Sequence, residues 1–179
     1  MTVLFIVGPP GAGKTTLVRR LLDPGSQLIA APKWTVGPRV CAAGHYSGGT
    51  FDGADTVPYN GVQLALAYWE SCLAAVPLTI LDGDRFSHAG VTSWFAGRAS
   101  LACLHLTTDD AVLGERRALR GSSQSPAWMK GRSTKAARFA DSFLGCLLRL
   151  DAAQPTDDLE IVLRDWLVAF PLASGPSLG

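Results

Sequence analysis

Residues 8–15 of the chain read Gly8-Pro9-Pro10-Gly11-Ala12-Gly13-Lys14-Thr15. This segment matches the phosphate-loop pattern G-x-x-x-x-G-K-[ST] at every fixed position. The apolar run at 3–7 predicts a buried strand before it, and residues 14–22 can form a helix that ends at 23–25, Asp-Pro-Gly. A strand, a glycine-rich loop and a helix N-terminus direct backbone N–H groups and the helix dipole at phosphate. In this context the segment predicts a polyphosphate site rather than a glycine-rich turn that binds nothing.

The residue types in the loop also predict its ligands. Lys14 can place positive charge on the β- and γ-phosphates of a nucleotide, and the Thr15 hydroxyl can ligate Mg²⁺. Asp82 ends the apolar run at 78–81 and is the first choice for a carboxylate that holds the metal through water. We therefore expect ATP and Mg²⁺ as cofactors, with Thr15 and Asp82 at the metal. The nucleotide-binding residues expected from the loop are Gly8, Pro9, Pro10, Gly11, Ala12, Gly13, Lys14, Thr15 and Thr16.

Length and composition indicate one globular domain. The chain has 179 residues, of which 47% are hydrophobic and 17% charged, which suits a packed core rather than a disordered chain. We expect a single domain at 1–170 and a flexible tail at 171–179. No apolar run reaches about 18 residues, so no membrane span is expected. A strand that begins at residue 2 or 3 leaves no room for a signal segment, which favours the cytoplasm.

Four cysteines and three histidines are dispersed along the chain without a ligand-like cluster. This spacing favours reduced cysteines and argues against a zinc site.

Strand-like and helix-like segments alternate along the chain. This order predicts an α/β fold of the P-loop type, with a five-stranded parallel sheet and helices on both faces. The expected strands are 3–7, 39–46, 78–81, 100–106 and 146–150. A short extended piece broken by Pro32 is expected at 27–34. The expected helices are 14–22, 61–75, 87–95, 108–120, 132–142 and one that begins at 156.

Polar clusters follow the expected strands, where open parallel sheets bind their ligands. Asp84 and Arg85 follow the third strand and are expected in the cleft, with Arg85 steering a substrate phosphate; the alternative is a tight turn. Asp52 and Asp55 lie in the loop after the second strand, and either could accept the proton of a reacting hydroxyl. Turn chemistry is the alternative for both. The aromatic residues of this region, Tyr46, Phe51 and Tyr59, could line a base site or belong to the core.

A basic segment lies between Glu115 and Arg138. It carries seven basic residues and one acid, Glu115. Such a segment predicts a lid, at about 115–135, whose arginines stabilise charge on a transferred phosphoryl group, although a solvated helix face is the alternative. Arg116 and Arg120 lie four residues apart and are the expected catalytic arginines, and Arg116 is also expected to bind the nucleotide. The expected substrate-contacting residues of the lid are Trp128, Lys130 and Arg132.

Taken together, these segments resemble the nucleoside and nucleotide kinase branch of the phosphate-loop proteins. The resemblance rests on 8–16, on Asp84-Arg85-Phe86, on the arginines at 116–120 and on the segment at 148–155. It implies that residues 151–155 border the base of ATP, with Ala153 and Pro155 as contacts.

A narrower resemblance is to bacteriophage kinases that phosphorylate 5-hydroxymethyluracil within DNA. It rests on FDGAD at 51–55, on RALRG at 117–121 with Gln124, and on WMKGR at 128–132 with Thr134 and Lys135. It implies a DNA partner whose target base leaves the stack, with lid cations on the flanking phosphates and, for a phage protein, action in the host cytoplasm.

The resulting hypothesis is an ATP-dependent kinase that transfers the γ-phosphate to a hydroxyl group. Its catalytic residues are expected to include Lys14, Asp52, Asp55, Asp84, Arg85, Arg116 and Arg120. The preferred acceptor is the hydroxymethyl group of 5-hydroxymethyluracil in phage DNA. The alternatives are a free nucleoside, nucleotide or other small hydroxyl compound as the acceptor, a nucleotide-switch or motor ATPase, and a binding module without catalysis.

Overall fold

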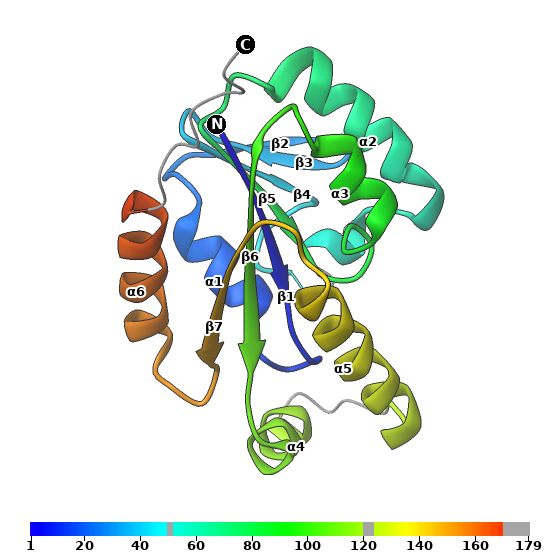
Figure 1. Cartoon of the computed structure of the whole chain (residues 1–179), viewed down its shortest axis with the longest axis vertical. Coiled ribbons are helices and arrows are strands. Elements are labelled where there is room, and N and C mark those ends of the chain that lie inside the picture. The colour runs from blue at the N-terminus through cyan, green and yellow to red at the C-terminus, as the bar shows by residue number, and fades with distance from the viewer. Residues whose placement is uncertain (50–51, 120–123, 170–179) are drawn as a thin grey trace.

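A computed structural model of the chain describes residues 1–49, 52–119 and 124–169, apart from the side chain of Arg117. Its centre is one sheet with the strand order β2-β3-β4-β5-β1-β6-β7 (Figure 1). The strands are β1 (Thr2–Val7), β2 (Gln27–Ile29), β3 (Trp34–Val36), β4 (Val40–Ala43), β5 (Leu78–Asp82), β6 (Ser100–Thr107) and β7 (Cys146–Asp151). The α-helices are α1 (Lys14–Leu21), α2 (Val62–Tyr68), α3 (Ala89–Phe95), α4 (Asp110–Leu119), α5 (Pro126–Asp141) and α6 (Thr156–Ala169). The α/β fold class predicted from the sequence is confirmed.

The sheet has seven strands rather than the five expected. The five expected strands are present and parallel, in the order β4-β5-β1-β6-β7. The additional two, β2 and β3, come from the segment interpreted as one broken extended piece, and they pair antiparallel at the β4 edge. Only three residues join β3 to β4, which permits an antiparallel pair but not a parallel crossover.

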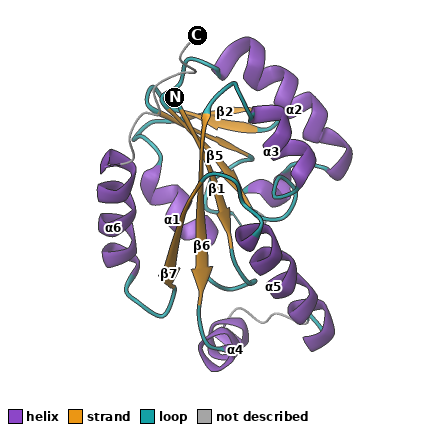
Figure 2. Ribbon diagram, in the orientation of Figure 1, coloured by secondary structure: helices purple, strands orange, loops and turns teal. Residues whose placement is uncertain are grey.

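Helices cover both faces of the sheet (Figure 2). Along β1 the side chains of Val3 and Phe5 belong to the core beneath α2, α3 and α5, while Leu4 and Ile6 belong to the core beneath α1 and α6. All four side chains are fully buried, as expected of a central parallel strand. The central position of β1 places the loop that follows it in the middle of the carboxyl edge of the sheet.

Two boundaries differ from the sequence prediction in ways that matter for the site. Strand β4 ends at Ala43 because Gly44, at φ 106°, turns the chain; a Cβ there would lie 2.2 Å from the carbonyl oxygen of Gly53. Helix α5 begins six residues before the predicted start, because the Ser125 side chain caps it and Pro126 occupies its first position. The predicted lid therefore consists of α4, the first half of α5 and a connection that lies partly outside the described residues.

Within residues 1–49, 52–119 and 124–169, none of the helices has both the length and the hydropathy needed to cross a bilayer.

Candidate nucleotide and acceptor site

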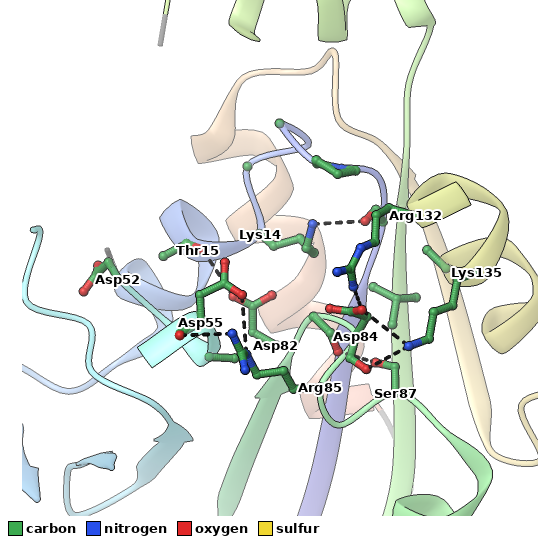
Figure 3. A pocket seen from close by; sticks show the side chains of 18 of the residues that line it. Lys14, Thr15, Asp52, Asp55, Asp82, Asp84, Arg85, Ser87, Arg132 and Lys135 are labelled. Atoms are coloured by element: carbon green, nitrogen blue, oxygen red, sulfur yellow. Dashed lines mark hydrogen bonds and ion pairs between the residues drawn. The ribbon is translucent and has the colours of Figure 1, made fainter. Parts of the chain in front are cut away.

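A cavity of about 460 Å³ opens at the carboxyl edge of the sheet. The phosphate loop between β1 and α1 forms one wall, and residues of the loop before α2, the turn after β5 and helix α5 form the rest (Figure 3). These segments are far apart in the sequence. The parallel strands bring them together, as proposed from the strand-end positions of the polar clusters.

Glycines give the phosphate loop its shape. Gly8, Gly11 and Gly13 have φ values of 155°, 91° and 85°, a region that other residues rarely adopt. A Cβ on Gly8 would also lie 2.6 Å from the carbonyl oxygen of Leu106 in β6. At Gly13 a Cβ would meet nothing within 4 Å, so only the backbone conformation requires glycine there. The loop therefore holds an open, concave backbone at the start of α1, which suits polyphosphate.

Lys14 lies across this concave backbone. Its Nζ donates to the carbonyl oxygens of Gly8 and Pro9, each at 3.0 Å. The ammonium group is therefore held at the centre of the loop by its own backbone. There it can meet phosphate oxygens without a rearrangement of the chain.

Asp82 combines deep burial with an unsatisfied oxygen. Its Oδ2 accepts from the Thr15 hydroxyl at 3.2 Å, but its Oδ1 is buried and has no hydrogen-bond partner among the residues that the structure describes. Burial raises the pKa of Asp82 to about 6, although the charge of Lys14 and the hydrogen bond from Thr15 lower it. An unpaired buried acceptor is costly, and a hydrated cation would supply the missing partner. Thr15 and Asp82 therefore fit a Mg²⁺ site at the phosphate loop.

Tyr46 lies directly behind this carboxylate. Its hydroxyl donates to Asp82 Oδ2 at 3.5 Å. Burial, together with the negative charges of Asp82 and Asp52, raises the pKa of Tyr46 well above its ordinary value. The hydroxyl therefore remains protonated and acts as a donor toward Asp82.

The two aspartates that the sequence left equivalent have different surroundings. Asp52 has a side chain only 4% exposed, and it forms an ion pair with Arg19 of α1. Its Oδ1 also accepts from the backbone N–H of Ser47 at 2.7 Å. Asp55, by contrast, has a side chain 77% exposed and lies 3.6 Å from the Arg85 guanidinium. Figure 3 shows Asp55 among the central side chains, whereas Asp52 lies apart from them.

A network of aromatic and charged side chains closes the far wall of the cavity. Asp84 forms ion pairs with Arg132 and Lys135 of α5. Arg132 also donates to the Tyr59 hydroxyl at 3.3 Å and lies 4.8 Å from the centre of the Trp128 ring. Through these contacts α5 is tied to the turn after β5 and to the loop before α2.

The network also includes Arg85, which contacts the ring of Tyr59. The guanidinium of Arg85 stacks on the Tyr59 ring at 4.2 Å from its centre. The positive charge of Arg132, through its hydrogen bond, lowers the pKa of Tyr59. Two aromatic rings at the mouth, Tyr59 at 67% and Trp128 at 39% exposure, are thus each covered by an arginine and still open to solvent.

A second cavity of about 270 Å³ lies on the other side of the phosphate loop. Gly11, Gly13 and Thr16 line both cavities, so the loop separates them. The remaining lining of the second cavity includes Ala12, Leu17, Arg116, Leu119, Ala152, Thr156 and Leu159. This cavity adjoins the phosphate loop on the side away from Asp55 and Arg132, a position that suits a nucleotide base.

The segment predicted to border the base adjoins the second cavity, but through other residues than those predicted. Ala153 and Pro155 are exposed and do not line the second cavity, whereas Ala152 is buried and does. The backbone N–H of Ala152 donates to the carbonyl oxygen of Thr107 at 2.6 Å, which continues the pairing of β7 and directs its side chain inward. Thr156 lines the cavity from the start of α6.

The predicted lid residues divide into three groups. Trp128 and Arg132 line the main cavity, whereas Lys130 is exposed on α5 and does not. Arg116 lines the second cavity, not the main one as the lid hypothesis required. Arg120 and Phe51 lie outside the described residues, as does the side chain of Arg117.

Sequence reasoning did not assign Lys135 or Tyr46 to the site. Lys135 was recognised only as part of a basic segment; one turn of helix from Arg132, it reaches the same aspartate. Tyr46 was left as either base wall or core, and its contact with Asp82 depends on the pairing of β4 with β5.

Comparison with known proteins is informative only at the level of structure. No protein-family model and no curated protein matches the sequence. One similar solved structure is a gluconokinase from Sinorhizobium meliloti 1021, with a TM-score of 0.58 and 14% identity over 94% of this chain and 92% of that one. Another is an unliganded sugar kinase from Janibacter sp. HTCC2649, with a TM-score of 0.57 and 16% identity over 97% of both chains. The chain therefore has the fold of these two kinases.

Proposed function

We propose that this protein is a Mg²⁺- and ATP-dependent kinase that transfers the γ-phosphoryl group to a hydroxyl compound. The observation that carries the proposal is the shared cavity. The phosphate loop, Asp82, Asp55 and Arg132 all line the same cavity of about 460 Å³. A nucleotide switch needs the first two features only, whereas a kinase also needs room and polar groups for an acceptor.

Each residue has a role that follows from its position. Lys14 holds the β- and γ-phosphates, and Thr15 and Asp82 hold Mg²⁺, which neutralises phosphate charge when bound. Asp55 is the group that accepts the proton of the acceptor hydroxyl, because its carboxylate is exposed in the cavity. Asp52 instead holds its loop against α1.

The cations of α5 act on the transferred group. Arg132 and Lys135 line the cavity opposite the phosphate loop and can stabilise the negative charge that develops during transfer. Both are now paired with Asp84, which orients them before substrates arrive. Arg116 borders the second cavity and is assigned to the nucleotide base or its adjacent phosphates.

A small hydroxyl compound is the acceptor that the cavity favours. Among the described residues, four cationic and four acidic side chains line the cavity: Lys14, Arg85, Arg132 and Lys135, and Asp52, Asp55, Asp82 and Asp84. The volume of about 460 Å³, shared with the phosphate loop, suits a small acceptor. The names of the two similar structures, a gluconokinase and a sugar kinase, support a small acceptor as well.

A hydroxymethylated pyrimidine in phage DNA remains the second candidate. Tyr59 and Trp128 are open aromatic faces at the mouth of the cavity, on which an extruded base could stack. Outside the mouth, Lys130 and Arg138 are exposed on α5 and form no ion pair with any residue that the structure describes. They could contact the phosphates that flank such a base.

Phosphoryl transfer from γ-labelled ATP tests the proposal and separates the acceptors. The panel comprises neutral sugars, sugar acids, nucleosides including 5-hydroxymethyldeoxyuridine, and duplex and single-stranded DNA that contains 5-hydroxymethyluracil. We expect label on a small acceptor, no label with Lys14→Ala, and no label on unmodified DNA. Label on modified DNA alone would establish the second candidate. Release of inorganic phosphate with no labelled acceptor would favour a switch ATPase, and absence of nucleotide binding would overturn the proposal.

A further inference from the structure

The further inference concerns Tyr46 and rests on the proposed function. Tyr46 follows β4 and is 8% exposed. Its backbone N–H donates to the Thr35 hydroxyl at 3.1 Å, which fixes its place at the end of the strand. No role in phosphate or acceptor binding accounts for its hydroxyl, which does not line either cavity.

Two hydroxyl groups share one oxygen of Asp82. Thr15 donates to Oδ2 at 3.2 Å and Tyr46 donates to the same atom at 3.5 Å, from opposite elements of the fold. Oδ1 has no partner. A carboxylate held by two donors at one oxygen cannot rotate without breaking both contacts, so the other oxygen keeps a fixed direction.

This arrangement remains possible when a metal is bound. A hydroxyl oxygen that ligates a cation keeps its hydrogen, so Thr15 can ligate Mg²⁺ and still donate to Asp82. Tyr46 has no such double task, because its hydroxyl contacts Asp82 alone among the described side chains. The Tyr46 hydroxyl therefore acts on the site through the Asp82 carboxylate.

Gly53 connects Tyr46 and Thr15 to the loop that carries Asp52 and Asp55, here called the acceptor loop. A Cβ on Gly53 would lie 3.2 Å from Cε1 of Tyr46 and 3.2 Å from Cγ2 of Thr15, and its φ of 78° also favours glycine. The backbone that carries Asp52 and Asp55 therefore packs directly on the tyrosine ring and the threonine methyl group.

We propose that Tyr46 is a positioning residue for Mg²⁺. With Thr15 it holds Oδ2 of Asp82, and so fixes the direction of the carboxylate that would hold Mg²⁺. Through Gly53 it keeps the acceptor loop seated against that metal site. The competing explanation is that Tyr46 only fills space in the core.

Calorimetric titration of a non-hydrolysable ATP analogue tests the inference with Tyr46→Phe. The analogue is titrated in excess EDTA and then at a series of Mg²⁺ concentrations. We expect metal-free binding within twofold of the wild type, and a half-saturating Mg²⁺ concentration raised about 3- to 10-fold, as for loss of a weak hydrogen bond to a charged group. Tyr68→Phe is the matched control, because it removes a tyrosine hydroxyl from α2 that does not line the cavity.

The outcomes separate this inference from the proposed function. If the wild type binds the analogue no better with Mg²⁺ than with EDTA, the proposed function itself fails. If the wild type responds to Mg²⁺ and Tyr46→Phe responds identically, or if the variant weakens metal-free and metal-bound complexes alike, only the positioning role is overturned. Thermal melts confirm that each variant is folded.

Gly53→Ala is a second variant that approaches the same unit from the other side. Its methyl group would press on both Tyr46 and Thr15. We expect the Mg²⁺ requirement to rise at least threefold while metal-free binding stays within twofold. An unchanged Mg²⁺ requirement in folded Gly53→Ala would contradict the link between the acceptor loop and the metal.

Discussion

The two walls of the cavity are built by different means. The phosphate loop is one continuous segment whose shape depends on glycine backbone angles and on contacts such as that of Gly8 with Leu106. The acceptor wall brings together side chains from three distant segments, joined by the Asp84–Arg132 ion pair (Figure 3) and by the stacking of Arg85 on Tyr59. One wall is thus specified by local sequence and the other by tertiary packing. Almost no substitution in the phosphate loop should be tolerated, whereas substitutions in the acceptor wall should change acceptor specificity gradually.

The largest expected effect is at the phosphate loop. Lys14→Ala removes the ammonium group that the loop backbone holds, and we expect phosphoryl transfer to fall by about 10³-fold or more. The melting temperature should stay within a few degrees of the wild type, because Lys14 is not a core residue. Transfer assays paired with thermal melts measure both. Near-normal activity of Lys14→Ala would show that the phosphate loop does not take part in the reaction.

The next effect distinguishes the two aspartates of the acceptor loop. Asp55→Asn should lower kcat by about 10²- to 10⁴-fold with little change in stability, because its exposed carboxylate serves the acceptor proton. Asp52→Asn should instead cost about 1–3 kcal/mol of folding free energy, because it weakens a buried ionic contact with Arg19. Steady-state kinetics and urea unfolding of both variants measure the difference. The reverse pattern would reassign the proton acceptor to Asp52.

A smaller effect is expected on α5, where neighbouring cations differ in position. Arg132→Ala should lower kcat about 10²-fold, because it removes a positive charge from the transferred group, and raise the acceptor KM about 5- to 20-fold, because it removes a contact that orders Tyr59 and Asp84. Lys130→Ala is the matched control outside the cavity and should leave both parameters unchanged for a small acceptor. A salt-dependent loss with Lys130→Ala on modified DNA would instead support the DNA candidate.

The smallest expected effect is a gain in folding stability when the buried carboxylate of Asp82 is removed. The folded state raises the pKa of Asp82 from 3.8 to about 6, so folding favours the protonated acid. The buried carboxylate therefore lowers stability progressively as the pH rises from about 4 through about 6, by at most about 3 kcal/mol. Asp82→Asn should melt about 2–8 °C higher than the metal-free wild type at pH 7.5 and no higher at pH 4.

The same variant should lose the stimulation of nucleotide binding by Mg²⁺. A melting temperature below that of the wild type at pH 7.5 would show that the Asp82 charge is compensated in the metal-free protein.

The difference between the walls also explains how much could be predicted from the sequence. The phosphate loop, β1 and the proposed roles of Lys14 and Thr15 follow from a contiguous pattern, and the parallel strands follow from apolar runs. Strands β2 and β3 were missed because strands of three residues carry too little periodicity to be recognised. The start of α5 was missed because a serine cap followed by proline was interpreted as part of a loop.

The functional differences among similar residues required the tertiary structure. The sequence places Asp52 and Asp55 three residues apart, and nothing in that spacing shows that Arg19 of α1 engages only the first. Arg116 was expected over the γ-phosphate because it belongs to a basic segment, yet the direction of α4 places it at the second cavity. The packing of distant elements decides which ion pairs form. The sequence therefore shows that such residues are charged, but not which partner each one contacts.

The most direct test of the account follows ATP by phosphorus-31 magnetic resonance in the presence of Mg²⁺, the protein and each class of hydroxyl acceptor. The account predicts a phosphomonoester signal that grows in step with ADP for at least one acceptor, and no such signal with Lys14→Ala. Conversion of ATP to ADP and inorganic phosphate alone, at the same rate with and without every acceptor, would contradict it.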